Sequence, residues 1–182
     1  MAWPEESSES DASPEQSVDT QVESDPATSA TIPPIGPGDL PEVAQRLSKM
    51  CVAEIRDVIV SLPETFGRVV LGDVLAPERI LVIPVSLEQA SQITVGWKGM
   101  HVARPLTHQL MHDVLGTFGL RLEFVAIVGV HEGNILAELH IAPPRGTART
   151  IPARASDAIG LALMSRPPTP IMVADALLGA HA

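Results

Sequence analysis

Three strand-type segments follow one another closely in the first half of the chain. Residues 51–62, 68–75 and 79–86 are rich in Val, Ile and Leu, and such runs favour extended backbone. Residues 63–67 and 76–78 separate them, and both contain the Pro that is typical of turns. Because strands joined by short connections usually lie side by side, this part of the sequence predicts an antiparallel meander.

Three helices are expected outside this meander. The pattern of residues 86–97 predicts the first helix, with Ser86 at its start. The second is expected over residues 107–118, because Gly119 is a typical residue to follow a helix C-terminus. Residues 156–166 are apolar nearly all round, which predicts a third helix that is buried.

The second half of the chain also contains strand-type segments. Residues 121–133 and 134–144 meet at a Glu-Gly-Asn tripeptide, which predicts a hairpin. A further strand is expected at 148–155, and a short strand with a helical turn at 169–178. The sequence therefore predicts an α+β fold, a single domain over roughly residues 48–180 with a mostly antiparallel sheet and about three helices.

The N-terminal segment has a different composition. Residues 1–38 hold eight acidic residues and no Lys or Arg, which gives a net charge of −8, and their only aromatic residue is Trp3. The other 14 of the 22 acidic residues are nearly balanced by 12 Lys and Arg. Such a segment buries too little apolar area to offset its ordering entropy, so residues 1–40 are expected to be a disordered acidic tail and linker. The tail would repel nucleic acid, and a solubilising role is favoured over competition for a basic site.

The sequence also bears on location and on cysteine chemistry. No apolar run approaches the roughly 18 residues of a membrane span, and the acidic N-terminus lacks the basic and apolar regions of a signal peptide. We therefore expect a cytoplasmic protein with no membrane partner. The single cysteine, Cys51, has no internal disulfide partner and is expected to be a small core residue rather than a nucleophile.

His108 and His112 lie four residues apart, the spacing of the zinc-protease motif H-E-x-x-H. Gln109 occupies the position of the glutamate, and a neutral amide cannot accept a proton from water. A zinc protease is therefore disfavoured. Helical periodicity places both histidines on the flank of an apolar stripe that is expected to face the core. This stripe comprises Leu106, Leu110, Met111, Val114, Leu115 and Phe118.

Two motifs, "RPLTH" at 104–108 and "ARASDAIGLAL" at 153–163, stand on either side of the predicted hairpin "VHEGNILAELHI". In this order and spacing they resemble the bifunctional nuclease family, over about residues 50–178. The family patterns are R-P-x-T-H-[DE]-L and A-R-P-S-D-[AS]-[IV]-A-[IL]-A, and this chain departs from them at Gln109, Ala155 and Gly160. The resemblance implies DNase or RNase activity, that is, hydrolysis of phosphodiester bonds.

Arginine precedes both motif helices. Arg104 and Arg154 each lie shortly before a predicted helix start, where guanidinium groups and free backbone N–H groups suit a phosphate. Thr107 and Ser156 are the expected N-caps of these helices and are also candidates to contact the phosphate. The alternative for each arginine is an ion pair with a local carboxylate, such as Arg154 with Asp157 or Glu88.

A nuclease needs a general acid or base as well as a phosphate clamp. His108 is the candidate, because an imidazole titrates near neutral pH. Asp157 and Glu88 complete the expected catalytic set, and Asp157 with Glu88 or Glu138 offers oxygen ligands for Mg²⁺ or Mn²⁺.

A second hypothesis comes from what the chain lacks for nucleic-acid binding. It has no broad basic stripe, and its few aromatic residues are two Trp and three Phe, so any footprint on nucleic acid should be small. The alternative is a non-catalytic, anion- or partner-binding oligomeric module. In that case the apolar third helix would lie at an interface between copies of the chain, and Arg104 and Arg154 would bind a small anion. The residues leave both hypotheses open.

Overall fold

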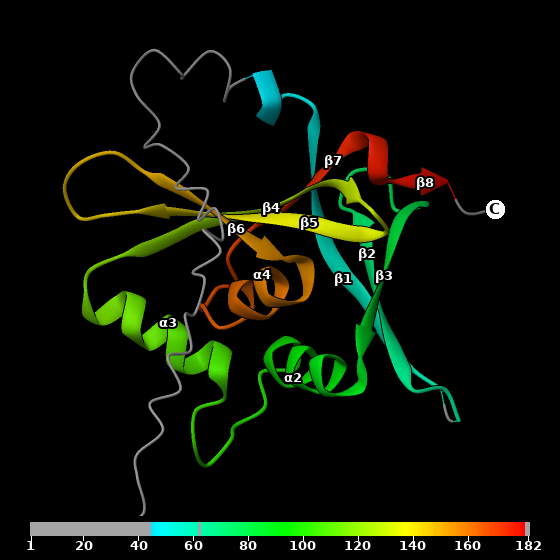
Figure 1. Ribbon diagram of the computed structural model, residues 1–182, viewed down its shortest axis with the longest axis horizontal. Helices are drawn as coiled ribbons and strands as arrows, with labels where there is room; N and C mark the ends of the chain where they lie inside the picture. Colours follow the sequence, from blue (N-terminus) through cyan, green and yellow to red (C-terminus); the bar gives the residue numbers. More distant parts are fainter. Residues whose placement is uncertain (1–44, 62, 181–182) are drawn as a thin grey trace, which may run out of the picture. The chain divides into compact units, whose positions relative to one another are not determined.

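The computed structural model describes residues 45–61 and 63–180 (Figure 1). The expected acidic tail and linker, residues 1–40, lie outside the described residues, so that expectation stays a prediction. A helical turn at 45–47 comes first. In chain order the further elements are β1 (Met50–Val60), β2 (Phe66–Asp73), β3 (Arg79–Ser86), α2 (Leu87–Trp97), α3 (Thr107–Thr117), β4 (Arg121–His131), β5 (Asn134–Ala142), β6 (Arg149–Arg154), α4 (Ala155–Ala162), β7 (Ile171–Ala174), the 3-10 turn η1 (Asp175–Leu177) and β8 (Gly179–Ala180).

The strands form one sheet in the order β6-β5-β4-β7-β1-β2-β3-β8. The predicted meander is confirmed, because β1, β2 and β3 pair in antiparallel fashion as sequence neighbours. β7 joins the two halves of the sheet, since it pairs in antiparallel fashion with β1 and in parallel with β4. The other described pairs are antiparallel, so the predicted α+β fold with a mostly antiparallel sheet is confirmed.

The hairpin between β4 and β5 turns where the sequence predicts. Glu132 and Gly133 both have positive φ angles, 49° and 78°, as a tight two-residue hairpin turn requires. The turn places Asn134 at the start of β5, directly opposite His131.

α4 is the central helix of the fold. Asp157 is its one partly exposed residue, and the others are buried against β4, β5, β6 and the two neighbouring helices. Figure 1 shows α2 and α3 on either side of α4, with the three helices on one face of the sheet. The predicted burial of the third helix is thus confirmed. The buried surface lies within its own chain, so α4 is not available as the interface that the oligomer hypothesis assigned to it.

The helix starts differ in part from the prediction. Ser86 caps α2, since its side chain accepts from the backbone N–H of Gln89 while the Gln89 side chain accepts from the Ser86 N–H. The predicted caps at Thr107 and Ser156 are wrong. α3 begins at Thr107 and α4 begins at Ala155, so both side chains fall inside the first turn, and neither helix has a side-chain cap.

α3 is oriented differently from the prediction. The apolar stripe was expected to face the core, but none of the residues of α3 is buried. Leu110, Met111, Val114 and Phe118 are between 42% and 71% exposed. His108, expected on the accessible flank, is 13% exposed instead and faces α4. None of the described helices is long and apolar enough to cross a membrane.

Candidate functional site

Three predicted site residues meet at the N-terminal end of α4. The guanidinium of Arg154 donates two hydrogen bonds to the carboxylate of Asp157, from Nε at 2.7 Å and from NH2 at 3.2 Å. Nε2 of His108, which comes from the first turn of α3, lies 3.6 Å from Oδ1 of Asp157. We call His108, Arg154 and Asp157 the α4 cluster. It joins a cation from the end of β6, an anion from α4 and an imidazole from α3.

The charges in the α4 cluster stabilise one another. The hydrogen bonds to Asp157 raise the pKa of Arg154 above its usual range, so the guanidinium stays charged. Its side chain is 75% exposed, and that of Asp157 is 38% exposed. An ion pair this exposed is weakened by the surrounding water, so an incoming anion can replace Asp157 on the guanidinium.

The position of His108 depends on Gly160, one turn further along α4 than Ser156. A Cβ added to Gly160 would lie 2.8 Å from Cε1 of His108 and 2.9 Å from both ring nitrogens. Because atoms cannot approach so closely, the ring occupies the space that an alanine side chain would fill. Gly160 is also one of the positions where the chain departs from the family pattern given above.

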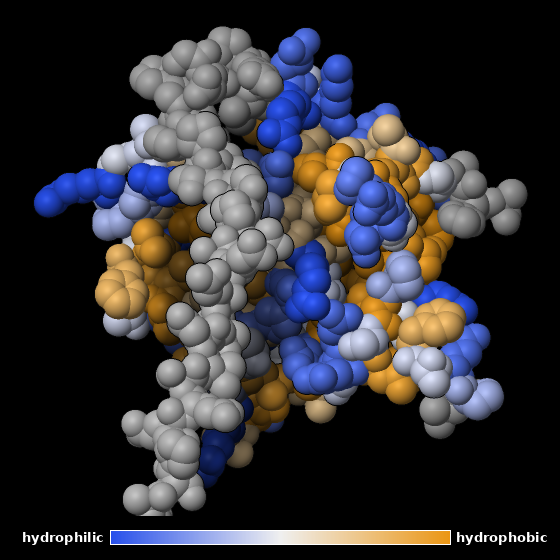
Figure 2. All heavy atoms as spheres, in the orientation of Figure 1, coloured by the Kyte–Doolittle hydropathy of each residue, from blue (hydrophilic) through white to orange (hydrophobic). Residues whose placement is uncertain are grey.

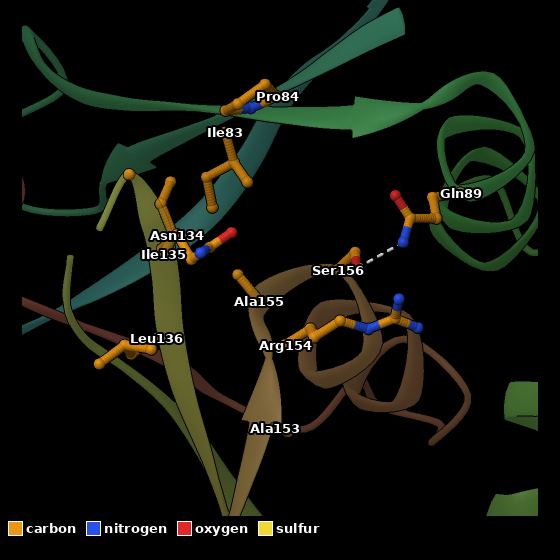
Figure 3. Close-up of a pocket in the computed structure, with 11 residues that line it drawn as sticks. Ile83, Pro84, Gln89, Asn134, Ile135, Leu136, Ala153, Arg154, Ala155 and Ser156 are labelled. Carbon is orange, nitrogen blue, oxygen red and sulfur yellow. Dashed lines mark hydrogen bonds between the residues drawn. The ribbon is translucent and has the colours of Figure 1, made fainter. Parts of the chain in front are cut away.

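A pocket of about 470 Å³ adjoins the α4 cluster (Figure 3). It is lined by Ile83 and Pro84 of β3, Gln89 of α2, residues 133–136 of the hairpin and residues 153–156, where β6 ends and α4 begins. We call it the hairpin pocket. Arg154 belongs both to its lining and to the α4 cluster, so the two share this residue.

The hydroxyl of Ser156 reaches this pocket although its residue is only 7% exposed. It accepts a hydrogen bond from Nε2 of Gln89 at 3.0 Å. The amide of Gln89 is fixed at its other end, because Oε1 accepts from the N–H of Ser86 at 2.8 Å. Sequence reasoning missed Gln89, although the pattern Ser-x-x-Gln at 86–89 is the signature of a capping box.

The remaining predicted residues do not join the cluster by hydrogen bonds or ion pairs among the described residues. Glu88, on α2, accepts from Gln92 of the same helix at 3.2 Å. Arg104 and Thr107 are exposed at the entry to α3, beside His108 in the sequence. The structure therefore brings His108, Arg154 and Asp157 together, and leaves Glu88 outside the group.

Glu138, the other candidate metal ligand, is engaged elsewhere on β5. It pairs with Arg46 at 3.0 Å and with Nε2 of His140 at 3.3 Å. Hydrogen bonding from His140, followed by that from Arg46, lowers the pKa of Glu138 below its usual range. Over the described ranges, no group of three or more His, Cys, Asp or Glu is placed to hold a metal ion. Asp157 is thus the one carboxylate of the α4 cluster.

A second polar cluster surrounds Arg79 at the other end of the sheet. Its guanidinium pairs with Asp73 at 3.3 Å and with Asp175 of η1. The thiol of Cys51 donates to Asp175 at 3.4 Å. Burial and the two carboxylates raise the pKa of Cys51, so the thiol stays protonated and is a poor nucleophile. Cys51 packs half-buried beside the core.

Comparisons with known proteins give the same family as the motifs. Residues 69–182 match the family model of the bifunctional nuclease domain. Two Mycobacterium tuberculosis proteins, the uncharacterized proteins MT1877 of strain CDC 1551 and Rv1829 of strain H37Rv, are each 34% identical to the chain over 101 residues. The match covers 56% of this chain and spans 58% of the length of each relative.

Proposed function

The chain belongs to the bifunctional nuclease domain family, and on that premise we propose that it hydrolyses phosphodiester bonds of DNA or RNA at the α4 cluster. The observation that carries this proposal is the convergence of His108, Asp157 and Arg154 at one helix end. These groups supply the two functions that the reaction needs, an acid–base group and a positive site for the phosphate.

Arg154 is the proposed phosphate ligand. Its planar guanidinium presents two donors to Asp157, and a phosphate oxygen pair accepts the same fork geometry. The first N–H groups of α4 have no partner within the helix, and the positive end of the helix dipole favours an anion there. Arg104 and Thr107, at the entry to α3, would contact the next phosphate along the nucleic-acid strand.

His108 is the proposed acid–base group. In the reaction an oxygen nucleophile, such as water, attacks phosphorus, and the bond from phosphorus to the leaving oxygen breaks. His108 accepts the proton of the nucleophile or donates one to the leaving oxygen. Asp157 lies 3.6 Å from Nε2, so it orients the ring and stabilises the imidazolium that forms. This distance is longer than a hydrogen bond, and such contacts commonly shorten when substrate binds.

A divalent ion fits the site only in part. Mg²⁺ is commonly held by one or two carboxylates together with phosphate oxygens of the substrate. Asp157 with those oxygens would be the ligand set for Mg²⁺ or Mn²⁺, and the bound ion would act as a Lewis acid on the phosphate. Glu88, which we expected as a partner carboxylate, bonds to Gln92 on α2 instead.

The test is hydrolysis of labelled DNA and RNA, each single- and double-stranded, with no divalent ion, with Mg²⁺ and with Mn²⁺. We expect cleavage of at least one substrate by the natural sequence, and a loss of about 100-fold or more in Asp157→Asn protein. Asp113→Asn, an exposed carboxylate of α3 outside the cluster, serves as the control and should cleave normally. Equal cleavage by all three proteins would assign the activity to a contaminant.

A second candidate function, a non-catalytic binding module that assembles with a second copy of the chain, is favoured by the surface of α3. Figure 2 shows apolar side chains exposed on the side of the molecule where α3 lies. The helix has no Lys or Arg, and Asp113 is its one acidic residue. A two-fold axis through such a face would place the same nearly uncharged surface on both copies. Light scattering after size exclusion should then show a dimer, and Leu110→Asp should convert it to a monomer. A monomeric natural protein would exclude this assembly through α3.

A further inference from the structure

We propose that the hairpin pocket binds one unpaired nucleobase of the substrate, so that the enzyme acts on single-stranded nucleic acid. The inference rests on the proposed function, because the base belongs to the nucleic acid that the protein is proposed to hydrolyse. Its binding test requires no hydrolysis, so the two proposals can fail separately.

The size and walls of the pocket suit a flat heterocycle. Its volume of about 470 Å³ lies within the range of roughly 300–1,000 Å³ typical of small-molecule sites. Ile83 and Pro84 of β3 form one apolar wall, and Ile135 and Ala153 contribute apolar surface from the neighbouring strands β5 and β6. Proteins that hold an extruded base commonly pack its faces between apolar or aromatic side chains.

Two polar side chains can contact the edges of such a base. Ser156 accepts from Gln89, and no acceptor for its own hydroxyl proton occurs among the hydrogen bonds of the described residues. Because Ser156 is 7% exposed and lines the pocket, its hydroxyl proton calls for an acceptor, which a ligand in the pocket can supply. Figure 3 shows the amide of Asn134 extending from the hairpin toward the side of the pocket where Ala155 and Ser156 lie. An amide offers both a donor and an acceptor.

The shared residue Arg154 connects the pocket with the α4 cluster. A nucleotide carries its base and its phosphate on one sugar, so a base in the pocket would place the adjoining phosphate near the start of α4, where Arg154 lies. A base inside a duplex has its pairing edge occupied and its faces stacked on its neighbours. It cannot enter the pocket without unpairing, and this cost favours single strands.

A plain anion site is the competing explanation for the same residues. An inorganic phosphate would use Arg154 and the start of α4, but it would gain nothing from Ile83, Pro84 or Asn134. The two explanations therefore predict different affinities for ligands that share a phosphate and differ in the base.

The experiment is calorimetric titration of the full chain, without divalent ions, with inorganic phosphate, ribose 5-phosphate and the four nucleoside 5′-monophosphates. We expect at least one nucleotide to bind about tenfold or more tightly than ribose 5-phosphate. Asn134→Leu, which removes the amide at similar size, and Asn134→Trp, which fills the pocket, should abolish this preference and keep the phosphate affinity. Gln92→Leu, an amide of α2 outside the pocket, is the matched control.

Equal binding of ribose 5-phosphate and all four nucleotides would overturn the inference, and so would a preference that survives both Asn134 variants. A cleavage assay then separates the two proposals. Hydrolysis of an abasic strand as fast as of a normal single strand would reject the base pocket and retain the nuclease. A base preference in binding, without hydrolysis of any substrate, would retain the pocket and reject the nuclease.

Discussion

The imidazole of His108 rests against the bare backbone of Gly160, with Cε1 only 2.8 Å from the place where a Cβ would stand. This fit holds the ring at 13% exposure, on a helix that has no fully buried residue, and places Nε2 3.6 Å from Asp157. The proposed acid–base group is therefore positioned by the absence of a side chain on the neighbouring helix.

Gly160→Ala should displace His108 without unfolding the protein. The atoms nearest to the added methyl group belong to the His108 side chain, which can rotate away, and alanine favours the helix over glycine by about 1 kcal/mol. We expect the midpoint of thermal unfolding to stay within a few degrees, while hydrolysis falls about tenfold or more. Thermal unfolding and initial rates on one substrate check this. Full activity in Gly160→Ala protein would show that the position of the ring is unimportant.

Gln89→Leu should lower the stability of the fold. The substitution removes the acceptor for the Ser86 N–H and the donor to the nearly buried Ser156. Loss of a helix cap together with a buried hydrogen bond typically costs about 1–3 kcal/mol. Urea denaturation measures the free energy of unfolding. The control Gln92→Leu should change it by less than about 0.5 kcal/mol, and equal effects of the two variants would contradict the role given to Gln89.

Stability at low pH should depend on the cluster around Arg79. A hydrogen bond from Arg79, and then one from Cys51, lowers the pKa of Asp175 below its usual range. A carboxyl group whose pKa is lowered on folding stabilises the fold above its unfolded pKa, about 3.9, and this contribution is lost as the pH falls through the folded value. Asp175→Asn should therefore weaken the loss of stability below about pH 4. Urea midpoints at pH 7, 5 and 3.5 test this, and an unchanged pH dependence would contradict it.

Much of the fold could be predicted because its signals are local. The short connections of the β1–β3 meander and the Glu132-Gly133 turn depend on residues next to each other in the sequence. The predictions of N-caps at Thr107 and Ser156 were wrong because the local signal there is compatible with two positions. Ser and Thr favour both the cap and the first turn, and the choice between them depends on where the preceding loop or strand ends.

The orientation of α3 could not be predicted in the same way. Periodicity identifies its apolar stripe, but the contact between His108 and Gly160 joins residues 52 positions apart and depends on how two helices pack. The separation of Glu88 from Asp157 has the same origin. Both residues lie in the first turn of a helix, and only the packing of the two helices decides that Glu88 bonds to Gln92 of its own helix and not to a residue of the α4 cluster.

The most direct test of the central claim compares two histidines of one helix. His108 lies in the α4 cluster, whereas His112, one turn later, is 35% exposed and lies 3.6 Å from Asp113. Initial rates of phosphodiester hydrolysis should be measured for the natural sequence, His108→Ala and His112→Ala, with thermal unfolding as the control for folding. We predict that His108→Ala loses about 100-fold or more in rate, while His112→Ala stays within about twofold. Equal rates in the two folded variants would contradict the assignment of the active site.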